Sequence, residues 1–249
     1  MSLIPARMRN LLWVKKSHLS ESEIKLFKKL STVVGRDPMS GDRIEMELFD
    51  DQKNVIGVPR HALDEFREAF KIVDQTSYPY MDWPEVTFTK NKKWRPGQAE
   101  MVDSILDYFE DEGEADALLD AKTGTGKTLM SLAVASGLQT PTLVLTHQNS
   151  LLERWYEERS FFPGLKMGRI QGSTWDYKGK HVTVAMIQTL HSRREWRLDH
   201  PEVTKHFGMI IEDECHRYGA QTFSEAMSVF HARYRLGVSA TFRRKDGLE

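Results

Sequence analysis

The chain has 249 residues, 40% of them hydrophobic, which is enough for one large domain or for a medium domain with a small one. Its formal net charge of -1 neither favours nor excludes a nucleic-acid partner. Cys215 is the only cysteine, which excludes an intrachain disulfide, and no apolar run approaches membrane-spanning length. We therefore expect no membrane partner and a reducing compartment, either a bacterial or phage-infected cytoplasm or a eukaryotic nucleus.

Residues 1–70 are predicted to form a small α+β accessory domain. Apolar residues recur at helical spacing over residues 21–30, and Ser20 followed by Glu23 is typical of a capping box. Further elements are expected as strands over residues 44–48 and 55–58 and as a helix over residues 61–70. Residues 1–36 are rich in Lys and Arg, with Trp13 among them, so this domain is a candidate for binding nucleic acid; a solvated basic face is the equally weighted alternative.

Residues 71–94 contain prolines, tyrosines and tryptophans and show little hydrophobic periodicity. They are therefore predicted to be a linker that is partly packed through its aromatic side chains. From residue 95 to 249 strands alternate with helices. This pattern predicts an α/β domain whose parallel sheet is covered by helices on both faces, with ligands at the carboxyl ends of the strands. The expected strands include residues 117–119, 142–146, 166–170, 181–187 and 236–238, and the expected helices include residues 101–109 and 150–159.

The segment Ala121-Lys-Thr-Gly-Thr-Gly-Lys-Thr128 lies between a predicted strand and a predicted helix. A glycine-rich turn in this position directs several backbone N–H groups and the positive end of the helix dipole at one point, which suits a phosphate. Lys127 would reach the β- and γ-phosphates of a nucleotide, and the Thr128 hydroxyl would hold Mg²⁺. Ala121 departs from the strict pattern, which begins with glycine. The residues expected to touch phosphate are Thr123, Gly124, Thr125, Gly126, Lys127 and Thr128.

A second motif, Met209-Ile-Ile-Glu-Asp-Glu-Cys-His216, is an apolar run that ends in acidic residues, as expected where a buried strand emerges at its carboxyl end. Asp213 would hold Mg²⁺, Glu214 would orient and deprotonate the attacking water, and His216 would sense the γ-phosphate. After a further short strand, Ser239 and Thr241 carry hydroxyls that could bridge the acidic motif to a neighbouring element.

Together these motifs resemble superfamily 2 helicases and translocases over residues 95–247. Arg95-Pro-Gly-Gln98 is similar to the glutamine element of that family, which implies that Gln98 recognises adenine and that Arg95 lies in the nucleotide site. Residues 122–128, 213–216 and 239–241 are similar to motifs I, II and III. The resemblance implies two RecA-like domains, ATP and Mg²⁺ as cofactors, and DNA, single-stranded or branched, as partner.

The segment Leu143-Val-Leu-Thr-His-Gln-Asn-Ser-Leu-Leu-Glu-Arg-Trp155 is similar to motif Ia, which lies along the nucleic-acid backbone in the family. With the Arg-Pro-Gly-Gln form and the ending Ser-Ala-Thr-Phe-Arg-Arg-Lys-Asp-Gly247, it resembles XPB-like and phage UvsW-like DNA helicases more than DEAD-box RNA helicases. Met186 stands where many relatives have threonine, and Cys215 where alanine is more usual. The residues implied to contact nucleic acid are Thr146, His147, Gln148 and Gln188.

Motifs IV to VI, including an arginine finger, belong to the second RecA-like domain in this family. The chain ends directly after motif III, so we expect a fragment that binds ATP weakly and hydrolyses it slowly or not at all. The function predicted for the full protein is an ATP-dependent DNA helicase or translocase. The alternatives are an RNA helicase or remodeller, and a nucleotide-dependent scaffold that does not translocate; the Asp213-Glu214 pair argues against the scaffold. A small-molecule P-loop kinase would leave Gln98, Thr146 and Ser239 unexplained.

Overall fold

The computed structural model describes residues 3–36, 43–88, 93–110, 115–192, 196–215 and 229–240. The chain divides into two compact units, one built on Met1–Thr76 and the other on Ser77–His216 and Ala232–Phe242. Each unit has a hydrophobic core of its own.

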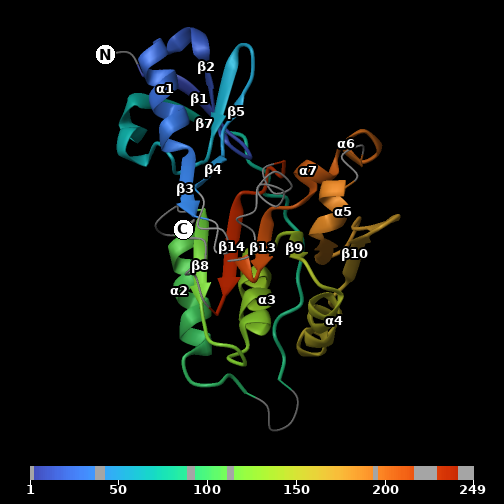
Figure 1. Ribbon diagram of the computed structural model, residues 1–249. Coiled ribbons are helices and arrows are strands. Elements are labelled where there is room, and N and C mark those ends of the chain that lie inside the picture. The colour runs from blue at the N-terminus through green and yellow to red at the C-terminus, as the bar shows by residue number, and fades with distance from the viewer. Residues whose placement is uncertain are drawn as a thin grey trace. The chain divides into compact units, whose positions relative to one another are not determined.

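The first unit contains a five-stranded sheet in the order β5-β6-β2-β1-β7 (Figure 1). Its strands are β1 (Ile4–Met8), β2 (Leu12–Lys15), β5 (Asp50–Asp51), β6 (Val55–Val58) and β7 (Phe70–Asp74). β7 pairs in parallel with β1, so residues 71–74 lie in this sheet rather than in the linker where the sequence interpretation put them. This segment forms a strand because Phe70 and Ile72, two residues apart, point to the same face and both pack on the core of this unit.

Helix α1 (Glu21–Leu30) begins at the predicted capping box. The Glu23 backbone N–H donates to Ser20 Oγ over 3.3 Å, and the Ser20 backbone N–H donates to Glu23 Oε2 over 2.7 Å. The helix leads into the hairpin of β3 (Thr32–Arg36) and β4 (Arg43–Glu47). The helix predicted over residues 61–70 is instead a 3₁₀ helix, Asp64–Ala69, because Phe70 already begins β7 and leaves too few residues for a stable α-helix.

The basic segment at the start of the chain is partly neutralised within this unit. Lys16 and Lys28 both form ion pairs with Asp51. The Trp13 indole N–H donates to Asn10 Oδ1 over 3.1 Å. Lys15, Lys25 and Lys29 are exposed and remain the lysines that a nucleic acid could reach.

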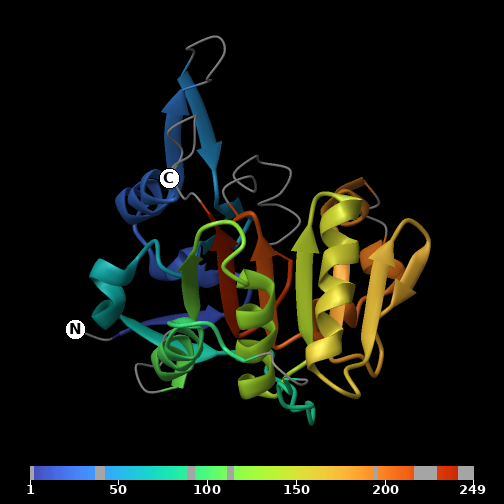
Figure 2. The ribbon, with the colours of Figure 1, turned by 90° about the horizontal axis from the view of Figure 1, so that it is seen from below.

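The second unit contains a seven-stranded sheet in the order β11-β10-β12-β9-β13-β14-β8 (Figure 2). All neighbours are parallel except β10 and β11, which form an antiparallel hairpin. The strands are β8 (Asp116–Asp120), β9 (Thr142–Thr146), β10 (Met167–Gln171), β11 (Thr174–Asp176), β12 (Val182–Met186), β13 (Met209–Asp213) and β14 (Tyr234–Ser239). Every residue of β9 and β12 is buried, as expected for central strands covered on both faces.

Helices α2 (Gln98–Glu110), α3 (Lys127–Leu138) and α4 (Asn149–Glu157) pack on one face of this sheet, where their apolar residues form a common core with it. A 3₁₀ helix, Glu158–Phe161, follows α4. Figure 2 shows α5 (Ile187–Ser192) behind the sheet, on the face opposite α3 and α4. Two short helices, α6 (Trp196–Asp199) and α7 (Val203–His206), follow α5. The α/β architecture with a largely parallel sheet between helices confirms the predicted fold class, and the small α+β unit precedes it.

Trp83 anchors the segment between the two sheets to the second unit. Its side chain is buried in the core of that unit, and its indole N–H donates to the Thr140 carbonyl over 3.0 Å. The expectation that this segment packs through its aromatic residues therefore holds for Trp83, whereas Tyr80 is exposed.

Candidate active site

The glycine-rich segment forms a tight loop between the carboxyl end of β8 and the first residue of α3. Gly124 and Gly126 have φ of +84° and +88°, a left-handed conformation that glycine adopts without steric cost. The first helical hydrogen bond runs from the Met130 N–H to the Gly126 carbonyl over 3.0 Å. The N–H groups of residues 127–129 therefore lack partners within the helix, and they face the loop as a set of anion donors.

The side chain of Lys127 lies inside this loop. Its ammonium donates to the Ala121 carbonyl over 2.9 Å, which places the charge at the centre of the turn. Thr128 is buried in the first turn of α3. Thr125 closes the loop through its backbone N–H and its hydroxyl, which both donate to the Lys122 carbonyl. The loop is thus ordered by its own hydrogen bonds.

Arg95 and Gln98, which precede or begin α2, are held against this loop. The guanidinium of Arg95 donates to the Gly124 carbonyl over 2.7 Å. Gln98 is buried; its Oε1 accepts from the Arg95 backbone N–H over 2.8 Å, and its Nε2 donates to the Thr125 carbonyl over 2.6 Å. Both functions of the amide are therefore engaged within the protein, and the adenine contact implied by the resemblance stays a prediction.

Asp213 ends β13 with a carboxylate that is 8% exposed. Its Oδ2 accepts a hydrogen bond from the Trp155 indole N–H over 2.9 Å. Burial raises the pKa of Asp213 above its usual value, and the nearby charge of Glu214 adds to the rise. The hydrogen bond from Trp155 and the positive charges of Arg154 and Lys127 act in the opposite direction and lower the pKa. Because β13 and β8 run parallel with β14 between them, Asp213 and the loop that holds Lys127 both lie at the carboxyl ends of these strands.

Glu214 follows directly with φ of +56°, an uncommon left-handed conformation for a residue with a side chain. Such backbone conformations cost about 1–3 kcal/mol and cluster at active sites. Ser239, at the end of β14, is buried, and its carbonyl accepts from the Ala121 N–H over 3.1 Å at the start of the loop. His216 and Thr241 lie outside the described residues.

The residues implied to contact nucleic acid lie where β9 and β12 end. Thr146 is fully buried, so its side chain is not on the surface. His147 is half-buried, whereas Gln148 and Gln188 are exposed, and Gln188 Nε2 donates to the His147 carbonyl over 2.8 Å. The structure therefore brings His147, Gln148 and Gln188 to one edge of the sheet and leaves Thr146 beneath it. The side chain of Thr146 is buried because β9 is covered on both faces, and a contact of this residue with nucleic acid stays a prediction.

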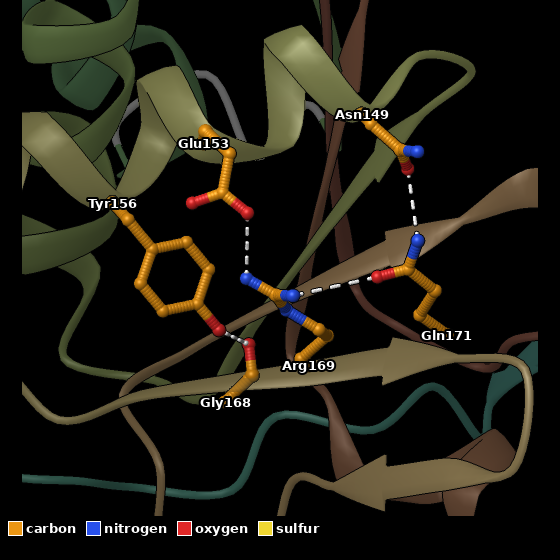
Figure 3. Close-up of polar contacts among 6 residues, drawn as sticks. All are labelled: Asn149, Glu153, Tyr156, Gly168, Arg169 and Gln171. Carbon is orange, nitrogen blue, oxygen red and sulfur yellow. Dashed lines mark hydrogen bonds and ion pairs between the residues drawn. The ribbon is translucent and has the colours of Figure 1, made fainter.

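A polar network that the sequence interpretation missed holds α4 against β10 (Figure 3). Arg169 pairs with Glu153 over 2.9 Å. Tyr156 donates to the Gly168 carbonyl over 2.7 Å, and Gln171 Nε2 donates to Asn149 Oδ1 over 2.8 Å. No motif predicts these pairs, since they join residues from different elements.

Thr189 supplies a hydroxyl near the position where Met186 had replaced the family's usual threonine. Its Oγ1 accepts from the Gly172 N–H over 3.0 Å, which ties the start of α5 to the turn after β10. Met186 itself packs in the core.

Within the described residues, no group of three or more His, Cys, Asp or Glu side chains is arranged to hold a metal ion. A divalent cation at Thr128 and Asp213 would therefore need ligands from phosphate and water, which is how Mg²⁺ is usually held beside a nucleotide. In the part of the chain that the structure describes, no helix has the length and apolar character that crossing a bilayer requires.

The site combines a glycine-rich loop at a helix N-terminus, an internal lysine, and a buried aspartate at the end of β13, which β14 separates from β8 in the same parallel sheet. This is the arrangement of a P-loop nucleotide-binding fold. A family model described as "Type III restriction enzyme, res subunit" matches residues 91–244. The chain belongs to this family, within the superfamily 2 helicases and translocases, and is similar to its XPB-like and UvsW-like members.

Individual comparisons agree with this assignment. "Putative ATP-dependent RNA helicase L396" of Acanthamoeba polyphaga mimivirus is 31% identical over 204 residues, which are 81% of this chain and 37% of the relative. "DNA 3'-5' translocase XPB2" of Sulfurisphaera tokodaii is 29% identical over 153 residues, 61% of this chain and 32% of the relative. The chain thus spans about a third of the length of these relatives.

The fold is also similar to a solved structure, the UvsW helicase from bacteriophage T4. The TM-score is 0.63 with 14% identity, and the match covers 96% of this chain and 93% of that one. At this identity the likeness concerns the fold alone.

Proposed function

We propose that this chain carries the ATP-hydrolysing site of a DNA helicase or translocase. The observation that carries the proposal is that β8, β14 and β13 are parallel, so the glycine-rich loop that holds Lys127 and the buried Asp213 carboxylate both lie at the carboxyl ends of strands of one sheet. A surface turn with a solvated lysine would not share the edge of a sheet with a buried carboxylate.

The loop suits a nucleotide because its geometry presents donors. The two left-handed glycines turn the backbone so that the N–H groups at the start of α3 face one point. Among the described residues other than its chain neighbours, none has an atom within 4 Å of where a Cβ of Gly124 would be. Lys127 would exchange its bond to the Ala121 carbonyl for phosphate oxygens. Thr123, Thr125 and Gly126 shape the loop, while Arg95 and Gln98 brace it from α2.

Thr128 and Asp213 are the proposed ligands of a magnesium ion, whose charge, when bound, offsets that of the phosphates. Glu214, one residue beyond, would accept the proton of the attacking water. Ser239, whose carbonyl already bonds the first residue of the loop, is proposed with Thr241 to transmit the state of the site, and His216 to sense the γ-phosphate.

A second RecA-like domain is the proposed partner of this site. In related NTPases an arginine supplied from outside the P-loop stabilises transition-state charge and contributes about 10³–10⁵ in rate. Residues 1–249 by themselves are therefore expected to bind ATP but to turn it over slowly.

The edge formed by His147, Gln148 and Gln188 is the proposed contact with DNA. Exposed amides and backbone N–H groups at such an edge would hold backbone phosphates and so bind without regard to sequence. Lys15, Lys25 and Lys29 of the first unit are proposed as a second, electrostatic contact. An RNA motor is the second candidate, because one relative of this chain is named as an RNA helicase.

The deciding experiment measures MgATP turnover by the full-length protein alone and with single-stranded, duplex or branched DNA or matched RNA. Stimulation by DNA alone supports the proposal, and the preferred DNA form would indicate its substrate. Stimulation by RNA alone would move the protein to the second candidate. If the protein bound ATP but neither nucleic acid stimulated turnover, the motor proposal would be wrong.

A further inference from the structure

Trp155 occupies a position from which it touches the candidate metal site. It lies on the buried face of α4 with Leu152, three residues earlier, and is 1% exposed. Its indole N–H donates to Asp213 Oδ2 over 2.9 Å. Since the indole has one donor and no acceptor, this hydrogen bond is the only conventional one the side chain can make.

That single bond constrains the carboxylate. The χ2 torsion of an aspartate has a broad energy minimum, so its carboxylate can rotate. The buried Asp213 therefore needs a contact from another residue to fix which oxygen faces the loop. With Oδ2 engaged by Trp155, Oδ1 is left to act as a ligand. Hydrogen bonds to ligating side chains orient them, and their loss typically costs 10–100-fold in metal affinity.

The donor is itself held in place by the neighbouring strand. The two residues of α4 that flank Arg154 and Trp155 are Glu153 and Tyr156, and Figure 3 shows both directed toward β10. Glu153 pairs with Arg169, and the Tyr156 hydroxyl donates to the Gly168 carbonyl. These contacts restrain the rotation and the slide of α4, and with them the position of the indole.

We infer that Trp155 is a positioning residue for the divalent cation: it holds the Asp213 carboxylate in the orientation that binds the metal accompanying the nucleotide. The inference rests on the proposed function, because it requires a metal–nucleotide site at Asp213. It goes further by giving a buried tryptophan of α4 a part in metal affinity.

The test compares nucleotide binding with and without metal. Trp155→Phe keeps an aromatic ring in the core and removes only the N–H donor. The matched control is Trp196→Phe, because Trp196 is equally buried and its indole donates to the Leu190 backbone carbonyl over 2.9 Å. ADP dissociation constants are measured for each variant in Mg²⁺ and in excess chelator.

Trp155→Phe is expected to weaken ADP binding about tenfold in Mg²⁺ and to leave it unchanged in chelator. Trp196→Phe is expected to leave the ratio of the two constants at the wild-type value. A Trp155→Phe variant with the wild-type ratio overturns the inference. Wild-type protein that binds no ADP in either condition overturns the proposed function instead.

A second measurement does not require the Trp155→Phe variant to fold. The indole N–H signals of wild-type protein are recorded by NMR with ADP, before and after Mg²⁺ is added, and are assigned by replacing the other tryptophans singly with Phe. The Trp155 signal is expected to shift on addition of Mg²⁺ and the Trp196 signal to stay in place. An unmoved Trp155 signal contradicts the inference.

Discussion

The side-chain amide nitrogen of Gln98 lies 2.6 Å from the carbonyl oxygen of Thr125, and this hydrogen bond joins the first residue of α2 to the phosphate loop. The amide oxygen accepts from the Arg95 N–H at the same time. Because both polar ends of the side chain are engaged, the amide supports the loop directly, and any adenine contact would require it to release one of these partners.

Gln98→Ala is expected to weaken the binding of ADP and GDP by the same factor, about tenfold. The change removes the hydrogen bonds with the Arg95 N–H and the Thr125 carbonyl. Leaving a buried group without its partner costs on the order of 1–3 kcal/mol, and here the loss falls on the loop rather than on the base. The measurement is the pair of dissociation constants, with Ser104→Ala in α2 as control. A loss confined to ADP would instead show that Gln98 reads adenine.

The two left-handed glycines of the loop provide a matched pair of variants. A Cβ at Gly126 would lie 2.4 Å from Gln98 Nε2, whereas a Cβ at Gly124 would have no described residue beyond its chain neighbours within 4 Å. Gly124→Ala is expected to lower the free energy of unfolding by about 1–2 kcal/mol, because alanine disfavours the left-handed backbone. Gly126→Ala is expected to lower it by about 1–3 kcal/mol more, because its Cβ would clash with Gln98. Thermal unfolding measures both.

If the clash with Gln98 Nε2 causes the extra loss of stability in Gly126→Ala, then adding Gln98→Ala should restore part of that stability. The double variant would then be more stable than the sum of the two single changes predicts. Strict additivity would show that the extra cost of Gly126→Ala arises elsewhere.

The sequence predicted the loop, the acidic strand end and the parallel sheet because each depends on local order along the chain. A strand, glycines and a helix in sequence produce the loop by backbone geometry, and parallel strands bring their carboxyl ends to one edge. Hence Lys127 and Asp213 could be placed in one site before the structure was known.

The remainder of the site depends on contacts between distant residues. The Trp155–Asp213 hydrogen bond and the Asn149–Gln171 pair arise from the way α4 packs, which no spacing in the sequence encodes. Similarly, the burial of the Thr146 side chain follows from the covering of β9 on both faces, which the motif alone does not show. Residue 71 was assigned to a linker because its parallel partner strand lies more than 60 residues earlier.

Lys127→Ala is expected to abolish measurable ATP binding, because the change removes the ammonium that lies inside the loop and would bind the phosphates. Lys122→Ala is the control, since Lys122 belongs to the same loop but is exposed. Affinity is measured with a fluorescent nucleotide. Equal affinity in the two variants would contradict the phosphate assignment of Lys127.

Glu214→Gln is expected to separate binding from hydrolysis. The amide cannot accept the proton of water, so turnover should fall by about 10²–10⁴, as for removal of other general bases. ATP affinity should change less than twofold, because the phosphate donors are untouched. ATP turnover by the full-length protein and ATP binding by residues 1–249 are measured side by side, with Glu158→Gln as control. If Glu214→Gln lowered turnover and ATP affinity equally, Glu214 would be assigned to ATP binding instead.

Glu212 predicts how stability depends on pH. Burial raises the pKa of its carboxyl to about 7; the charge of Arg235 lowers it in opposition, and that of Asp116 adds to the rise. The folded protein therefore holds a proton that the unfolded chain releases near pH 4.5, so the free energy of unfolding should fall between about pH 4.5 and 7 and level off above. Each unit of pKa shift is worth about 1.4 kcal/mol, so the whole change is at most roughly 3.5 kcal/mol. Glu212→Gln should remove this slope and raise stability at pH 8, measured by denaturant unfolding across pH. A slope as steep in Glu212→Gln as in wild type would assign it to other groups.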